Sequence, residues 1–245
     1  MSSGFLRASL RLLVVQGAWS YERMTGVGLG YAAEPLLEDL KSADPTRHAE
    51  ASVRSAEYFN SHPYLAGLAV GALVRAEYDQ VPGAQISRLR AALTSPLGAL
   101  GDQVFWAGLV PATMSVAMLG VVAGAAIWVV PLALLLYNVA RVGTGVWALR
   151  TGLANGAHIG TALGESWLPR WAPGLGLAGG LLVGIAVPLA ADWLLVGQKP
   201  TGVLLAMGTV VAGLVASWKL GPHTTSVRFG LAVIGLAALA ASGLP

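Results

Sequence analysis

Charged and uncharged positions divide the chain near residue 103. Most of the acidic residues come earlier, and beyond that point only Glu165 and Asp192 are acidic. No side chain from Val104 to Ala140 carries a formal charge, and this run exceeds the ~20 residues that a transmembrane helix needs. The pattern therefore predicts a polar, amphipathic helical part at residues 1–102 and a transmembrane helical part at residues 103–245.

The uncharged runs of the second part predict about five transmembrane helices. The first run is too long for one span, and Pro131 lies past its middle, so we divide that run in two. The predicted spans are 104–124, 126–148, 171–191, 200–218 and 229–244. We therefore expect an all-α, polytopic membrane protein.

The first 102 residues predict helices of mixed polarity. Leu6, Leu10 and Leu13 recur at helical spacing, with Arg7 and Arg11 beside them. This arrangement is typical of an amphipathic helix that lies on a membrane surface or against another subunit.

We expect this polar part to include re-entrant hairpins. The apolar segment Pro63–Val74 is too short to span a bilayer, so it suits a re-entrant or buried position. Asp44-Pro45-Thr46 predicts a helix start, and Ile86–Leu93 predicts a short helix. Ser95–Gly101 predicts irregular backbone, which at membrane depth must be covered by protein or line a cavity.

The composition agrees with a membrane protein and limits the chemistry. Mean hydropathy is +0.66, with 55% hydrophobic and 11% charged residues. A net charge of +3 is too small to indicate nucleic-acid binding. Cysteine is absent, and no acidic residue stands at a metal-like spacing from the scattered histidines, so we expect no metal and no cofactor.

Glycines recur every four residues in one stretch of the second part. Residues with this spacing share a helical face, and small side chains there allow helix backbones to approach closely in lipid. We favour packing within the chain over a subunit interface. The glycines are Gly152, Gly156, Gly160 and Gly164.

A few polar side chains in apolar surroundings are candidates for substrate or partner binding, and none is a catalytic candidate. Each also has a structural interpretation, as a surface pair, a turn, a helix cap or a packed polar group. An ionisable residue inside a predicted span is a functional candidate by default. The candidates are Glu22, Arg23, Asn60, His62, Asp102, Asn138 and Arg141.

Four short motifs in this order resemble one family. The chain is similar to the IID membrane component of the mannose/fructose/sorbose class of bacterial phosphotransferase systems. The motifs lie at Trp19–Met24 with Tyr31-Ala32, Tyr58–Tyr64, Pro96–Trp106 and Asn138–Arg141.

The resemblance implies a multi-pass subunit of the bacterial inner membrane. It implies that this subunit pairs with a IIC membrane subunit to carry a hexose-type sugar. Soluble IIA and IIB subunits would carry the phosphoryl group as phosphohistidine, so this chain would not be an enzyme by itself. The sugar would be phosphorylated by IIB as it is released.

Three departures from the family pattern keep alternatives open. Ser95 replaces a usual Gly, Gln103 replaces a usual Pro, and Ala154 stands where a Lys is frequent. These changes motivate a regulatory or scaffolding subunit that binds phosphotransferase partners without moving sugar. A stand-alone channel or membrane enzyme would need a complete polar pathway or a catalytic constellation, and the sequence offers neither.

Overall fold

A computed structural model describes residues 2–195 of the chain. The chain divides into two units, Met1–Val187 and Pro188–Pro245, and the first is described below. The predicted spans 200–218 and 229–244 lie outside the described residues. The elements are α1 (Ser2–Leu12), α2 (Gly26–Ala43), α3 (Pro45–Ser55), α4 (Ala66–Tyr78), α5 (Gly83–Gly101), the π-helical segment η1 (Asp102–Leu109), α6 (Val110–Val122), α7 (Ala126–Asn155), the 3-10 turn η2 (Gly156–His158), α8 (Ile159–Glu165) and α9 (Trp167–Leu195).

The elements within residues 2–195 are all helices, joined by turns and loops, and β-type pairing there is limited to two isolated bridges, Ser20–Met24 and Met24–Phe59. The expected all-α class is therefore confirmed for this part of the chain. Two helical stretches, Gly83–Val122 and Ala126–Trp193, are long and apolar enough to cross a bilayer. They contain the predicted spans 126–148 and 171–191 and all but the last two residues of 104–124.

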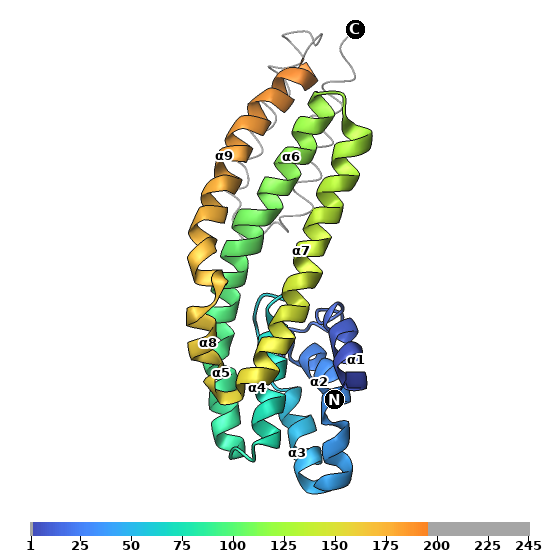
Figure 1. Cartoon of the computed structure of the whole chain (residues 1–245), viewed down its shortest axis with the longest axis vertical. Helices are drawn as coiled ribbons and strands as arrows, with labels where there is room; N and C mark the ends of the chain where they lie inside the picture. Colours follow the sequence, from blue (N-terminus) through green and yellow to red (C-terminus); the bar gives the residue numbers. More distant parts are fainter. Residues whose placement is uncertain (1, 196–245) are drawn as a thin grey trace, which may run out of the picture. The chain divides into compact units, whose positions relative to one another are not determined.

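Helices α6 and α7 run side by side as a hairpin (Figure 1). A short turn joins them, in which Gly124 has a φ of 75°, a backbone conformation that favours glycine. Gly120 of α6 packs so closely on α7 that an added Cβ would lie 2.5 Å from the Cβ of Val129. The turn falls between the two spans into which the first uncharged run was divided.

The prediction of irregular backbone at Ser95–Gly101 is wrong. Helix α5 continues through Pro96 to Gly101 and leads without a break into η1 and α6. Leu93, Leu97 and Gly101 recur every four residues and are all buried. Burial of this one helical face keeps the segment helical, although Pro96 removes one backbone hydrogen bond.

Helix α4 forms the centre of the core, because every residue from 66 to 74 is buried. It packs against the second half of α7 (Figure 1). Glycines make this approach possible: a Cβ at Gly71 would lie 2.5 Å from the backbone nitrogen of Leu153, and one at Gly152 would overlap the carbonyl oxygen of Leu68. The short apolar segment predicted at Pro63–Val74 is thus enclosed by protein.

Helices α1, α2 and α3 pack around this core. Asp44 accepts a hydrogen bond from the backbone N–H of Arg47 at 2.9 Å, and Pro45 is the first residue of α3, as the Asp-Pro-Thr motif predicts. Arg7 and Arg11 of α1 pair with Glu38 and Glu34 of α2. This pairing turns the basic side of α1 toward the protein.

Candidate functional site

The loop between α3 and α4 contacts three other segments that are far from it in the sequence. Phe59 bonds with the loop before α2, while His62 and Tyr64 contact η1. Tyr64 also contacts α7. Five rings from these segments form what we call the aromatic cluster: His62, Tyr64, Phe105, Trp106 and Tyr137.

His62 is the buried centre of the aromatic cluster, with 2% of its surface exposed. Its Nδ1 accepts a hydrogen bond from the backbone N–H of Tyr64 at 3.3 Å, and its Nε2 has no partner among the described residues. Gly101 leaves the necessary space, because a Cβ there would overlap the Cβ of His62. Burial lowers the pKa of His62 to about 4, since apolar surroundings disfavour the imidazolium. The ring is therefore neutral at pH 7.

Arg141 of α7 lies beside the aromatic cluster and is partly buried. Its guanidinium carbon is 5.4 Å from the centroid of the Tyr64 ring, which is within the range of a cation–π contact. The hydroxyl groups of Tyr64 and Tyr137 lie 3.1 Å apart. Among residues 2–195, no carboxylate lies within 4.0 Å of Arg141. Tyr137 and Arg141 are one helical turn apart, so both reach Tyr64 from one face of α7.

The loop before α2 joins the site through backbone bonds. The backbone N–H and the hydroxyl of Thr25 both donate to the carbonyl of Phe59, at 2.9 and 2.8 Å. The N–H of Phe59 in turn donates to the carbonyl of Arg23 at 3.3 Å. Arg23 donates from Nη1 to the carbonyl of Ala56 at 3.0 Å. Glu22 and Arg23 are both exposed and form no ion pair with each other.

Two candidates, Asn60 and Asp102, are exposed polar residues next to the buried contact of His62 with Gly101. Asp102 does not cap a helix, because it continues α5 into η1. Asn138 is exposed and donates to the carbonyl of Leu134 in its own helix at 2.8 Å. The structure thus brings Asn60, His62, Asp102 and Arg141 to one region, whereas the side chain of Asn138 bonds locally.

The sequence analysis missed a buried ion-pair network. Glu77 of α4 is 3% exposed. Arg54 donates to its carboxylate from Nε at 2.9 Å and from Nη2 at 3.1 Å, and Nη2 of Arg47 lies 3.0 Å from it. The only sequence signal was one acid near the end of an apolar segment, and nothing in the sequence indicates partners more than twenty residues away.

Arg90 of α5, 5% exposed, was missed in the same way. It donates to the carbonyls of Ser55 and Glu57 at 3.1 and 3.3 Å. These carbonyls lie at the end of α3, where a helix leaves acceptors unpaired. Arg90 therefore fixes the start of the loop that carries Asn60 and His62.

The four-residue glycine repeat does not lie on one continuous helix. Helix α7 ends at Asn155, Gly156 has a φ of 51°, and α8 begins at Ile159. Gly152 packs against α4, whereas a Cβ at Gly160 or Gly164 would meet no described atom within 4 Å. Glycine at 156 ends the helix instead of continuing its packing face.

Comparison with known proteins gives a family match. A family model described as the PTS system mannose/fructose/sorbose family IID component matches residues 2–194. The mannose-specific EIID component of Escherichia coli strain K12 is 26% identical over 192 residues, which cover 75% of this chain and 65% of that protein. The fructose permease IID component of Bacillus subtilis strain 168 is 26% identical over 194 residues, covering 76% and 67%. The aligned region thus spans about two thirds of the length of these relatives.

Two solved structures share the fold. A cryo-EM structure of the mannose transporter ManYZ in complex with microcin E492 gives a TM-score of 0.57 and 25% identity, covering 76% of this chain and 69% of that one. A structure described only as that of a membrane protein gives a TM-score of 0.69 at 22% identity, covering 98% and 97%.

Proposed function

Because this chain belongs to the mannose/fructose/sorbose family of IID components of the phosphotransferase system, we propose that it is the IID subunit of a sugar permease. In this proposal it crosses the bacterial cytoplasmic membrane several times and pairs with a IIC membrane subunit. Together the two subunits form the pathway by which a mannose-, fructose- or sorbose-type sugar enters the cell.

The observation that carries the proposal is the contact of four distant motifs around one loop. Phe59 bonds to the backbone of Arg23, His62 stacks on Phe105, and the guanidinium of Arg141 lies over the ring of Tyr64. These are the same four segments that resemble the IID family. Their contact at one place supports a shared role. If each motif had only its own structural role, the four motifs would not need to meet.

The chemistry exposed at this place suits a sugar. A transported sugar must exchange its hydration shell for polar side chains. Asn60 offers an amide and Asp102 a carboxylate, and the loop that carries Asn60 is packed against the segment that carries Asp102. Trp106 leaves 50% of its surface exposed, and an exposed aromatic ring offers an apolar face for packing. We propose that Asn60 and Asp102 bond sugar hydroxyl groups and that Glu22, Arg23 and Asn138 contact partner subunits.

Phosphoryl transfer is assigned in this proposal to the soluble IIA and IIB subunits. His62 is unsuited to carry phosphate, because its Nδ1 accepts a backbone hydrogen bond and its Nε2 is buried. Its role is to hold the loop against η1, so that the neighbouring polar residues keep their positions.

The three departures from the family pattern all lie on the surface. Ser95, Gln103 and Ala154 are exposed, so their side chains change what the chain presents to its surroundings and leave the aromatic cluster intact. The alternative role is that of a regulatory or scaffolding subunit, and an experiment must distinguish it from a transporting subunit.

The test is purification of the tagged full chain from its native membrane in mild detergent, with partners identified and counted by mass spectrometry. We expect a second multi-span protein at near-equal amount and a soluble phosphohistidine subunit. A membrane partner without any soluble phosphocarrier would favour the regulatory role. Recovery of the chain alone would contradict both roles.

A further inference from the structure

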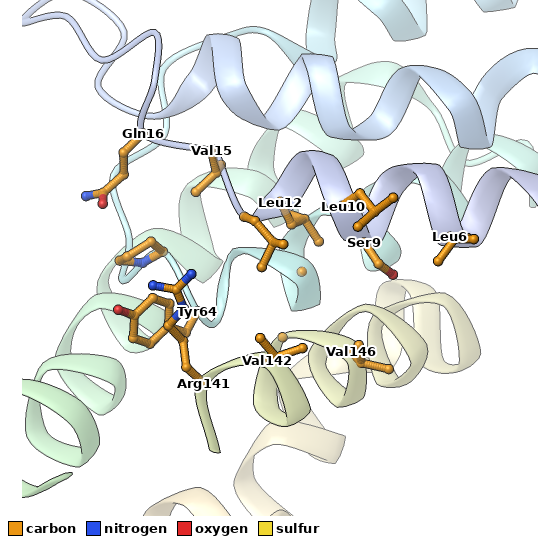
Figure 2. Close-up of a pocket in the computed structure, with 14 residues that line it drawn as sticks. Leu6, Ser9, Leu10, Leu12, Val15, Gln16, Tyr64, Arg141, Val142 and Val146 are labelled. Atoms are coloured by element: carbon orange, nitrogen blue, oxygen red, sulfur yellow. The ribbon is translucent and has the colours of Figure 1, made fainter. Parts of the chain in front are cut away.

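A pocket of about 250 Å³ lies between α1, the start of α4 and the middle of α7 (Figure 2). One wall is formed by leucines of α1 and the other by Val142 and Val146 of α7. Tyr64, Gln16 and Arg141 lie together at one end, and Leu6 lies at the other (Figure 2). The pocket is therefore mainly apolar, with its charged group at one end. Ser9 also lines it, near Leu6 (Figure 2), and its hydroxyl donates to the carbonyl of Phe5 at 2.8 Å.

Arg141 is the single charged residue among those that line the pocket. Its Nε is buried and has no hydrogen-bond partner in the described part of the chain. No described carboxylate lies within 4.0 Å of its guanidinium. A partly buried cation without a counter-ion attracts an anionic ligand.

The position of Arg141 along α7 indicates the source of that anion. The uncharged stretch Ala126–Ala140 extends ~22 Å at the helical rise of ~1.5 Å per residue. With the turn at Gly124 near one boundary of a hydrocarbon core ~30 Å thick, Arg141 comes within reach of the opposite headgroup region.

Helix α1 gives independent support for an interfacial position. Leu6, Leu10 and Leu13 are 63%, 57% and 48% exposed, while Arg7 and Arg11 pair with α2. An amphipathic helix whose apolar side faces away from its own protein is suited to the boundary between headgroups and acyl chains.

We propose that this pocket binds one anionic phospholipid. Its phosphate pairs with Arg141, and one acyl chain lies between the α1 leucines and Val142 and Val146. The pocket is too small for a partner helix, which is about 10 Å wide with its side chains, whereas a single acyl chain fits an elongated apolar space. The lipid would supply the counter-ion that Arg141 lacks within residues 2–195.

The test is native mass spectrometry of the full chain, purified with its bound partners and equilibrated with equal amounts of phosphatidylglycerol and phosphatidylcholine. We expect one phosphatidylglycerol to be retained with about fivefold preference. Arg141→Gln should remove the preference. Arg88→Gln, which removes an exposed cation of α5 outside the pocket, should keep it. Equal retention of both lipids, or an unchanged preference in Arg141→Gln, would overturn the proposal.

A second measurement uses the absence of cysteine from the chain. Leu10→Cys places one thiol on the pocket wall for a fluorophore, and Val53→Cys, at a side chain 70% exposed outside the pocket, is the control. Brominated phosphatidylglycerol should quench the probe at position 10 more strongly than brominated phosphatidylcholine, with no such difference at position 53. If neither brominated lipid quenched the probe at position 10, the proposal would be overturned and the pocket would be assigned to a protein partner. Neither readout involves sugar uptake, so neither depends on the proposed function.

Discussion

The imidazole ring of His62 is stacked on the phenyl ring of Phe105, with centroids 5.0 Å apart and planes inclined by 15°. This contact joins the loop before α4 to the π-helical segment η1. Both segments carry an exposed polar residue of the candidate site, Asn60 in the loop and Asp102 in η1. The geometry of the site therefore depends on how His62 is packed.

Gly101→Ala should disturb this packing directly. A Cβ at position 101 would overlap the Cβ of His62, and neither atom is the flexible end of a side chain. We expect a loss of ~1–3 kcal/mol of stability and reduced sugar uptake. Gly98→Ala is the matched control on the same helix, because the nearest atom to its Cβ would be the Cα of Ser61 at 4.0 Å. Thermal unfolding in detergent compares the two, and equal melting temperatures would contradict the packing role.

Burial of neutral His62 makes stability depend on pH. The folded pKa of about 4 lies below the unfolded value of ~6.5, so only the unfolded state takes up a proton between these values. The contribution of His62 is fully present above pH ~6.5 and is lost as the pH falls toward 4, by roughly 2–3 kcal/mol in all.

The matching measurement is the melting temperature from pH 8 to pH 4 for the unaltered chain and for His62→Gln, which has no imidazole to protonate. The unaltered chain should lose more stability than the variant below pH 6.5, and the two profiles should run parallel above it. Parallel profiles over the whole range would show that His62 is not held neutral.

The network around Glu77 predicts a large loss from a small change. Glu77→Gln removes the charge that Arg47 and Arg54 both contact and leaves partly buried cations without a partner. We expect a loss of ~3 kcal/mol, or about 10 °C in melting temperature. Glu50→Gln removes an exposed partner of Arg54 and should cost at most ~0.5 kcal/mol. Similar effects of the two substitutions would mean that the Glu77 pairs add little.

Because α4 packs closely on α7, substitution of two glycines of the same sequence repeat should change stability by different amounts. A Cβ at Gly152 would overlap the backbone of α4, whereas a Cβ at Gly160 would meet no described atom within 4 Å. Gly152→Ala should therefore destabilise the chain by ~1–3 kcal/mol, and Gly160→Ala should be neutral or slightly stabilising. Thermal unfolding separates them, and the reverse order would contradict the observed packing.

The sequence predicted the parts of this fold that depend on local pattern. Long uncharged runs predict the helices around Val104–Val122 and Ala126–Ala148, and Asp44-Pro45 predicts the start of α3. The glycine and proline content of Ser95–Gly101 misled the prediction, because burial of Leu93 and Leu97 outweighs local helix propensity. The prediction that the glycines of the repeat at 152–164 share one helical face was wrong for a related reason. Spacing alone does not reveal that Gly156 ends a helix.

The candidate site could be predicted only as a set of separate residues. Asn60, His62, Asp102 and Arg141 were selected singly, and their proximity depends on tertiary contacts such as that of Tyr64 with Tyr137. The ion pairs of Glu77 and the carbonyl bonds of Arg90 join residues more than twenty positions apart. Pairing over such distances leaves no periodic signal in one sequence.

We propose that this chain forms part of a sugar pathway in which Asn60 and Asp102 contact the substrate. The most direct test of this proposal is phosphoenolpyruvate-dependent uptake of labelled mannose, fructose and sorbose in cells that contain the complete complex. The tested cells carry the unaltered chain, no chain, Asn60→Ala or Asp102→Ala, each normalised to the amount of assembled complex. We expect that uptake of one sugar requires the chain and falls at least about tenfold in Asp102→Ala. Uptake that persists without the chain, or that is unchanged in both variants while the complex assembles normally, would contradict the proposal.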